Sequence, residues 1–163
     1  MPELEGKQNM QTYFADYFSL LQNCHNDIHK ALDGLPPAAL DWTPGIDMNS
    51  ISVLIIHLTG AERYWIGDVA AQEPSIRDRD AEFQVKGLGT DALKKRLDDS
   101  LTYASTALEK FALQDLEASR HSPRSEHEFT VGWSLLHALE HSTLHLGQIQ
   151  LTRQLWEQRG NNS

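Results

Sequence analysis

The amino-acid sequence predicts an all-α protein, a four-helix bundle formed by a single domain over residues 1–163. Apolar side chains recur at intervals of three and four over four long segments, which is the period of a helix buried along one face. Alternating patterns typical of strands are scarce. A chain of 163 residues is long enough to bury a core without disulfides or a structural metal. Four such helices without strands between them favour a bundle.

The first two helices are expected at about 10–32 and from about 49 onward. The apolar stripe of the first helix consists of Phe14, Phe18, Leu21, Ile28 and Leu32, and the turn sequence DGLPP at 33–37 ends it. Either Asn49 or Ser50 could cap the second helix. Its inward positions are Ile51, Leu54, Leu58, Ala61 and Trp65. Both helices therefore present one apolar face to a common core.

The third and fourth helices each follow a long connection. We expect Thr90 to cap the third helix, whose apolar positions are Leu93, Leu97, Leu101, Ala104, Leu108 and Phe111. The fourth helix is expected at about 131–158. The connection at 71–89 is longer than a hairpin between adjacent antiparallel helices needs, and its length suits a crossover between parallel helices. The charged segment 115–130 is also long, and such loops often border functional sites.

Composition and charge argue against several classes of partner. The formal net charge is −9, from 14 Lys and Arg against 23 Asp and Glu, and no basic run gathers enough positive field to bind nucleic acid or an anionic membrane. The apolar run at 51–58 is far shorter than the roughly 20 residues that span a bilayer. The acidic N-terminal segment MPELEGKQNM does not have the pattern of a secretion signal. Cys24 is the only cysteine, which fits a reducing compartment. We therefore expect a cytoplasmic protein.

The sequence LLHALEHSTLHLGQ carries three histidines spaced four residues apart, His137, His141 and His145. Chance would place about 0.4 pairs of histidines at this spacing in the chain, whereas the sequence has three, namely His25 with His29, His137 with His141 and His141 with His145. Neutral imidazole is a common ligand for zinc and similar ions, and two histidines one turn apart can reach one ion. His137 and His145 would lie about 12 Å apart along a helix, so they cannot share an ion. His141 belongs to either pair, and the periodicity leaves the choice of its partner open.

A third ligand should come from another helix of the bundle. His57 is embedded in SVLIIHLTGAERYW, beside the inward stripe of the second helix, where a hydrogen-bonded core histidine and a metal ligand are equally open interpretations. His25 borders the stripe of the first helix and is a weaker candidate, while His29 is expected to face outward. His121 and His127 lie in the charged connection, where we expect solvated side chains.

Three stretches occur in a characteristic order over roughly 10–158. They are LDWTPGIDMNSISVLIIHLTGAERYW at 40–65, RDRDAEF at 77–83 and WSLLHALEHSTLHLGQI at 133–149. Together they resemble the DinB-like superfamily of small bacterial four-helix-bundle metalloproteins. The resemblance implies an up-down-down-up bundle, with the long crossover between the second and third helices, and a homodimer.

The same resemblance implies a ligand set. By position, His57, His141 and His145 correspond to the residues that bind a divalent metal in the family, which makes His137 a neighbour of the site. Zinc or nickel is expected ahead of iron or manganese. Three neutral histidines with positions left for water or substrate are typical of an open, catalytic site. A divalent ion held in this way can lower the pKa of a water or thiol.

Characterised relatives in this superfamily include thiol S-transferases that add bacillithiol or mycothiol to electrophiles. The first hypothesis is therefore a metal-dependent enzyme acting on a small-molecule substrate, with a low-molecular-weight thiol or water as the nucleophile. The second is a non-catalytic, metal-binding dimeric protein. A purely structural bundle with core histidines is less favoured, because His141 and His145 share one helix face with His57 available opposite.

The sequence assigns no catalytic residue. Glu62 and Glu140 flank the expected ligands in the chain, but both lie well around their helices from the histidine face. We expect each of them to be a surface group or a group that supports the ligands. Cys24 sits in an apolar helical pattern, so we expect a buried thiol without a part in the chemistry.

Overall fold

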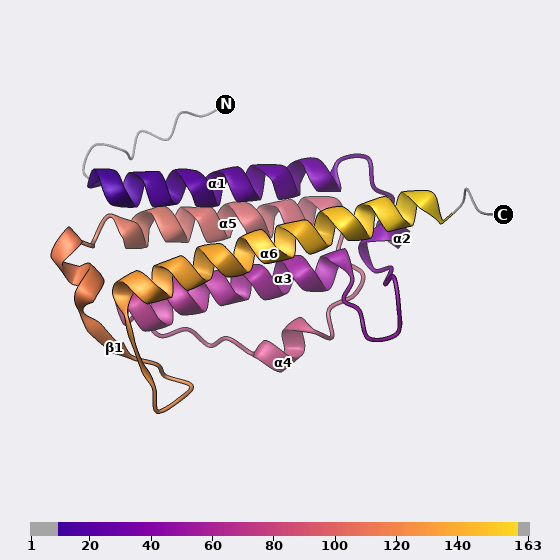
Figure 1. The fold of residues 1–163 in the computed structure, drawn as a ribbon. Coiled ribbons are helices and arrows are strands. Elements are labelled where there is room, and N and C mark those ends of the chain that lie inside the picture. Colours follow the sequence, from indigo (N-terminus) through magenta and orange to yellow (C-terminus); the bar gives the residue numbers. More distant parts are fainter. Residues whose placement is uncertain (1–9, 160–163) are drawn as a thin grey trace.

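Four long helical segments lie side by side in the computed structural model, which describes residues 10–159 (Figure 1). They are α1 (Thr12–Leu32), α3 (Ile51–Glu62) with its π-helical continuation η1 (Arg63–Ala71), α5 (Thr90–Leu108) and α6 (Val131–Gln158). Residues 1–9, most of the segment that argued against a secretion signal, lie outside this range. Within the described residues no helix combines the length and the apolar character needed to cross a bilayer.

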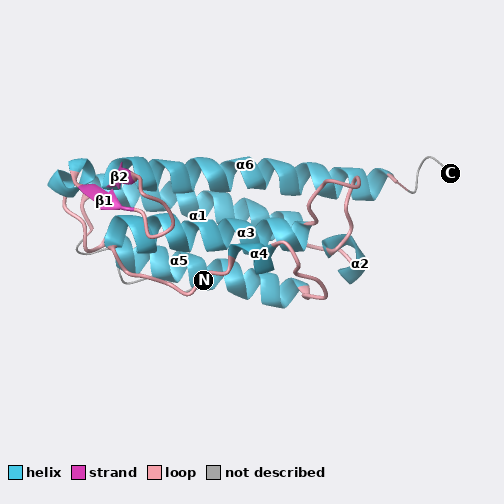
Figure 2. Ribbon diagram, turned by 90° about the horizontal axis from the view of Figure 1, so that it is seen from below, coloured by secondary structure: helices cyan, strands magenta, loops and turns pink. Residues whose placement is uncertain are grey.

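The four segments run up, down, down and up along the bundle, as predicted. α1 and α6 run one way along the bundle, and α3 and α5 run the other way (Figure 1). α5 and α6 each pack against both α1 and α3. Between η1 and α5 the chain returns along the outside of α3 through residues 72–89, which include the short helix α4 (Arg79–Glu82) (Figure 2). The up-down-down-up bundle and its long crossover are thereby confirmed.

The helix starts follow local capping chemistry. The Ser50 hydroxyl accepts a hydrogen bond from the backbone N–H of Val53 at 3.3 Å, so Ser50 is the cap of α3. The prediction that Thr90 caps α5 is wrong, because Gly89 occupies the extended N-cap position and Thr90 is already the first helical residue. A glycine caps with little loss relative to a hydroxyl residue, so the helix begins one residue earlier than expected.

Several smaller elements differ from the sequence prediction. α1 begins at Thr12 rather than near Met10, and α5 ends at Leu108 rather than Phe111. The turn after α1 leads into a single helical turn, α2 (Pro37–Leu40). The charged connection contains a 3₁₀ helix, η2 (Leu113–Glu117), and a hairpin of β1 (Ser119–His121) and β2 (Glu128–Thr130), paired antiparallel. Strands of three residues are too short to give a period-two signal, so the pattern did not reveal them.

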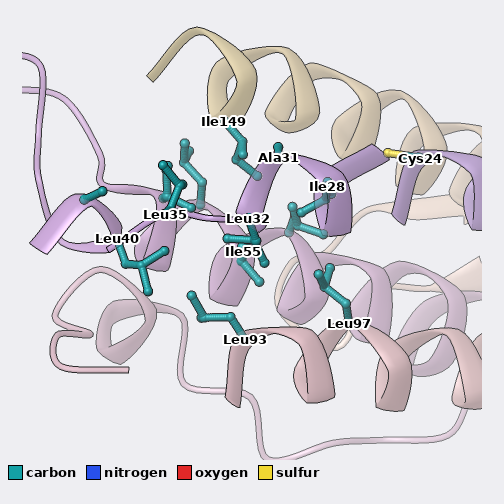
Figure 3. Packing of buried hydrophobic residues seen from close by; sticks show 14 residues of the cluster. Cys24, Ile28, Ala31, Leu32, Leu35, Leu40, Ile55, Leu93, Leu97 and Ile149 are labelled. Carbon is teal, nitrogen blue, oxygen red and sulfur yellow. The ribbon is translucent and has the colours of Figure 1, made fainter. Parts of the chain in front are cut away.

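The apolar core consists of two clusters stacked along the bundle. The cluster at the α2 end contains Ile28, Leu32, Ile55, Leu93, Leu97 and Ile149, whose side chains converge between the helices (Figure 3). The cluster nearer the hairpin contains Phe14, Phe18, Leu21, Ile66, Leu108 and Leu135. The residues of the two clusters are about one turn apart on α1 and two or three turns apart on the other three helices. A polar layer lies between the clusters.

Glu62 is the centre of this polar layer. Its side chain is 1% exposed and its carboxylate accepts hydrogen bonds from the hydroxyls of Ser100 at 2.5 Å and Ser142 at 2.6 Å. The Nε2 atom of His25 lies 2.8 Å from the same carboxylate. Burial works to raise the pKa of Glu62, but His25 and the hydroxyl hydrogen bonds outweigh it and lower the pKa. Of the two roles expected for Glu62, a surface group or a group that supports the ligands, the surface role is wrong, because each of the four long helices contributes one residue to a buried polar cluster.

Cys24 is buried beside this layer, as predicted. Burial raises the pKa of its thiol to about 12, and the charges of Glu62 and Asp27 add to the effect. A thiol with this pKa carries almost no thiolate at neutral pH, and the thiolate is the reactive form.

Candidate metal centre

His57, His141 and His145 meet on one side of the bundle, where α3 and α6 pack together. Each offers one ring nitrogen, and the three nitrogens lie within 4.8 Å of one another. The ring centroid of His57 is 4.9 Å from that of His141 and 5.1 Å from that of His145. Among the described residues this is the only group of His, Cys, Asp or Glu side chains with such spacing. The fold thus brings together the three residues that the resemblance implied.

The two histidines of α6 already have the spacing of ligands to one ion. Their Nε2 atoms are 3.1 Å apart. Two nitrogens bound at about 2.1 Å would be about 3.0 Å apart at an octahedral angle and about 3.4 Å apart at a tetrahedral one. The His141 and His145 pair falls within this interval. Only a short approach of His57 is needed to complete a set of three nitrogens on one ion.

Two of the rings are fixed through their second nitrogen. His57 Nδ1 lies 2.9 Å from the Glu82 carboxylate, which is held by Arg77 through contacts of 2.5 and 2.8 Å. His145 Nδ1 lies 2.6 Å from the side-chain oxygen of Gln148. In both rings the partner accepts the Nδ1 proton, which leaves Nε2 as an unprotonated donor to a metal. Carboxylates and amides of this kind orient metal-binding histidines and raise their basicity.

His141 is held neutral. Burial lowers its pKa to about 3, and His145, His57, His137 and Arg77 add to the effect. Burial also lowers the pKa of His145, against a hydrogen bond with Gln148 that works to raise it. Metal ligation needs the unprotonated imidazole, so both side chains are in the required state at neutral pH. His141 Nδ1 is buried without a hydrogen-bond partner among the described residues, whereas its Nε2 lies 3.1 Å from Nε2 of His145.

The donor set fits a divalent cation of the zinc and nickel type. Three neutral imidazole nitrogens suit borderline metals. Burying three such nitrogens together removes them from water, and a bound ion would compensate for the hydrogen bonds to water that they lose. No carboxylate or thiolate belongs to the group, so an ion held by these three residues would keep its full positive charge.

The remaining histidines take other roles. His137 stacks on Trp133 at 4.7 Å and meets Trp65 edge-on at 4.8 Å, outside the cluster of three. His25 is committed to the buried Glu62, and the partly exposed His29 lies 3.1 Å from Asp98. Both histidines of the charged connection, His121 and His127, are exposed as predicted. Glu140 is also exposed, which agrees with the surface role expected for it.

Pattern analysis missed the residues that support the ligands. Glu82, Arg77 and Phe83 all come from the RDRDAEF stretch of the crossover, and the Phe83 ring lies 4.8 Å from that of His57. Nothing in the local sequence indicates that this stretch folds back on α3. Gln148 could have been found, because it follows His145 by three residues on one helix and can therefore reach it.

A cleft of about 330 Å³ opens beside the histidine cluster. Its walls come from α3, η1, the crossover, the hairpin and α6. The lining residues are His57, Ala61, Tyr64, Trp65, Arg77, Arg79, Ser122, Arg124, Ser125, Phe129, His137 and His141. Two of the three expected ligands therefore face a space large enough for a small molecule.

The fold is a helical bundle, and its cluster of three histidines could hold a metal ion. The family model described as the DinB superfamily matches residues 20–149, and the chain belongs to this superfamily. No curated protein matches the sequence significantly.

Solved structures from several bacteria share the fold. A conserved protein from Enterococcus faecalis has a TM-score of 0.73 at 16% identity, over 89% of this chain and 97% of that one. A DinB-like protein from Bacillus cereus has a TM-score of 0.69 at 14% identity, over 93% and 94% of the two chains. YfiT from Bacillus subtilis, described as a probable metal-dependent hydrolase with an unusual four-helix bundle topology, has a TM-score of 0.63 at 14% identity over 88% and 89%. At these identities the likeness concerns the fold.

Proposed function

We propose that this protein is a metal-dependent enzyme in which His57, His141 and His145 hold a divalent ion that activates a small thiol or water for attack on an electrophilic small molecule. The observation that carries the proposal is the open side of the histidine cluster, since His57 and His141 both line the cleft. A closed structural site would surround its ion with four protein ligands, whereas here the cleft takes the remaining side. The similarity to YfiT, itself described as a probable metal-dependent hydrolase, supports metal-dependent chemistry.

The bound ion would supply Lewis acidity that lowers the pKa of a thiol or water in the cleft. The proton released there needs an acceptor from the protein. The cleft lining contains no carboxylate, and apart from the ligands only His137 offers an imidazole nitrogen that can accept a proton. We assign His137 as this acceptor. In thiol transfer, the sulfur bonds to the electrophilic carbon, its proton passes to His137, and the leaving group departs with the electron pair of the broken bond.

Elemental analysis of untagged protein, followed by activity assays, tests this proposal. Protein loaded with zinc or nickel is mixed with a panel of small thiols and chlorodinitrobenzene, and separately with a nitrophenyl ester to detect attack by water. We expect the protein to show one of these two activities. Chelation should abolish it, and His145→Ala should lose both this activity and the metal. Activity that survives both treatments would overturn the mechanism. Stoichiometric metal without either activity would favour a non-catalytic metal-binding protein.

We also propose that the protein forms a homodimer through α6. Leu136, Leu144 and Leu151 are more than half exposed and share one face of this helix. Exposed apolar side chains that share one helix face commonly mark an interface. Sedimentation should therefore give a dimer, and Leu144→Lys a monomer, whereas Leu113→Lys on the exposed 3₁₀ helix η2 should leave the dimer intact. A monomeric parent protein would overturn the proposal.

A further inference from the structure

The cleft beside the histidine cluster has a charge opposite to that of the whole protein. The chain carries a net charge of −9, yet the twelve residues that line the cleft include three arginines and no Asp or Glu. At the chain's average composition, twelve residues would hold about one basic and about two acidic side chains. A cationic cleft in an acidic protein concentrates positive potential where a small ligand would bind.

One of the three arginines is already neutralised. Arg77 is largely buried and forms a two-point ion pair with Glu82, which serves the orientation of His57 described above. Its charge is therefore compensated within the protein. The positive character of the cleft comes from the other two, Arg79 and Arg124.

Arg79 and Arg124 have no carboxylate partner among residues 10–159. Each guanidinium instead lies over an aromatic ring, Arg79 at 5.1 Å from the centre of Phe83 and Arg124 at 5.4 Å from that of Tyr64. Arg124 also donates a hydrogen bond to the backbone oxygen of Arg77. Asp78, the neighbouring acid, accepts a bond from the Ala81 backbone at 3.1 Å as the cap of α4. Stacked on rings, the two guanidinium groups keep donors for an external acceptor and lose less conformational entropy on binding.

The wall formed by η1, β2 and α6 is aromatic. Phe129 stacks on Trp133 at 4.6 Å, and Trp133 stacks on His137 at 4.7 Å. Trp65 meets all three rings edge-on at 4.8 to 5.2 Å. Rings locked in this way form a rigid apolar surface that suits the flat or hydrocarbon part of a ligand.

We infer that the cleft binds a small organic anion, with its carboxylate or phosphate group at Arg79 and Arg124 and its apolar part against Trp65 and Phe129. Because His57 and His141 line the same cleft, such a molecule would lie beside the proposed metal site. The inference that this anion is the substrate rests on the proposed function. The inference that the cleft binds an anion depends only on the two arginines and the aromatic wall. Arg79 and Arg124 then select the substrate and bind it in position.

Calorimetric titration of chelator-treated, metal-free protein tests the inference with benzoate and its uncharged analogue benzamide. We expect benzoate to bind with a dissociation constant on the order of 1 mM, as befits so small a ligand. Benzamide should bind at least tenfold more weakly, because a charge-assisted bond to a guanidinium is lost. Added salt should weaken benzoate binding and leave benzamide unchanged. Phenyl phosphate titrated in parallel distinguishes a phosphate from a carboxylate preference.

The matched variants are Arg79→Gln, Arg124→Gln and Arg120→Gln, which change the net charge equally. Arg120 lies on the same hairpin as Arg124 but does not line the cleft. The first two should weaken benzoate binding about tenfold, and Arg120→Gln by less than twofold. Absence of benzoate binding, or equal binding by all three variants, would overturn the inference. Because the titrated protein is metal-free, benzoate binding that depends on the two arginines would support the inference even if the metal proposal failed. Conversely, absence of benzoate binding would not affect the test of metal affinity.

Discussion

Gly60 provides a sharp test of whether the crossover orients the metal ligands. A methyl group at this position of α3 would lie 2.9 Å from Cδ of Glu82 and closer still to its Oε1, whereas ordinary contact begins at 3.4 Å. The closest carboxylate atom, Oε1, must then move by about 1 Å, which exceeds the tolerance of about 0.5 Å within which a functional site has to be held. The bonds of this carboxylate to His57 at 2.9 Å and Arg77 at 2.5 Å cannot both survive that movement.

We expect Gly60→Ala to weaken zinc binding by about 10 to 100-fold, the range that follows loss of an orienting partner of a ligand. This corresponds to about 1.4 to 2.7 kcal/mol. The fold should survive, because the atoms displaced belong to the end of a side chain and alanine is favoured over glycine in a helix by about 1 kcal/mol. Competition with a chromogenic chelator measures the affinity, and thermal unfolding of metal-free protein measures the stability.

Gly147→Ala is the matched control. Gly147 also lies inside a helix, two residues from His145, but a methyl group there would meet nothing within 4 Å. Both variants gain the same helix propensity, so only the displacement of Glu82 separates them. Glu82→Gln is a second route to the same loss, in case Gly60→Ala fails to fold. If Gly60→Ala and Glu82→Gln bind zinc as tightly as Gly147→Ala, then Glu82 does not orient His57 and the reasoning is refuted.

The remaining predictions concern the ligand set, the polar layer and the cysteine. His145→Ala should lose stoichiometric zinc, whereas His137→Ala should retain it and lose catalytic activity. Equal metal loss in both variants, measured by elemental analysis, would contradict the ligand assignment. Glu62→Ala should cost about 3–5 kcal/mol in urea unfolding, because it leaves His25 buried without its partner. A cost below about 1 kcal/mol would show that the buried pair contributes little. The folded-state pKa of Glu62 lies below its usual value of 4.5, so its stabilising contribution is present above that pH and is lost as the pH falls through the folded-state value. Acid unfolding of Glu62→Gln should accordingly be less steep than that of the parent protein, and identical acid profiles would argue against this linkage. The thiol of Cys24, with a pKa of about 12, should stay unreactive toward a disulfide reagent in the native protein and react fully in denaturant. Rapid labelling of the native protein would contradict its burial.

The two ligands on α6 could be inferred from the sequence because they lie close together in the chain. His141 and His145 are one turn apart on α6, and the helical repeat alone places them on one face. The repeat also shows that His137 and His145 cannot share an ion. Choosing His145 rather than His137 required the family resemblance, since both are four residues from His141. The choice of His57 as the third ligand rested on the same resemblance. The fold then placed His57 across from His141 and His145, with His137 to one side among the tryptophans.

Glu62 shows where helical-wheel reasoning was insufficient. Its position well around α3 from the histidine face predicts a surface group or a group that supports the ligands, but a bundle helix has a second buried side facing the other helices. Three partners from three other helices make that burial possible, and none of them is near it in sequence. Satisfying a buried carboxylate is a property of the whole bundle rather than of one segment.

The sequence by itself determined the four long helices, their order, the spacing of His141 and His145 on α6 and the length of the crossover, because these depend on spacing along one chain segment. Only the tertiary structure decided that Glu82 and Arg77 return to His57 and that Arg79 and Arg124 line one cleft with Trp65 and Phe129. It also decided that four helices meet at Glu62. These contacts join residues far apart in sequence, and the packing of the bundle and its crossover sets their distances, which no local periodicity encodes.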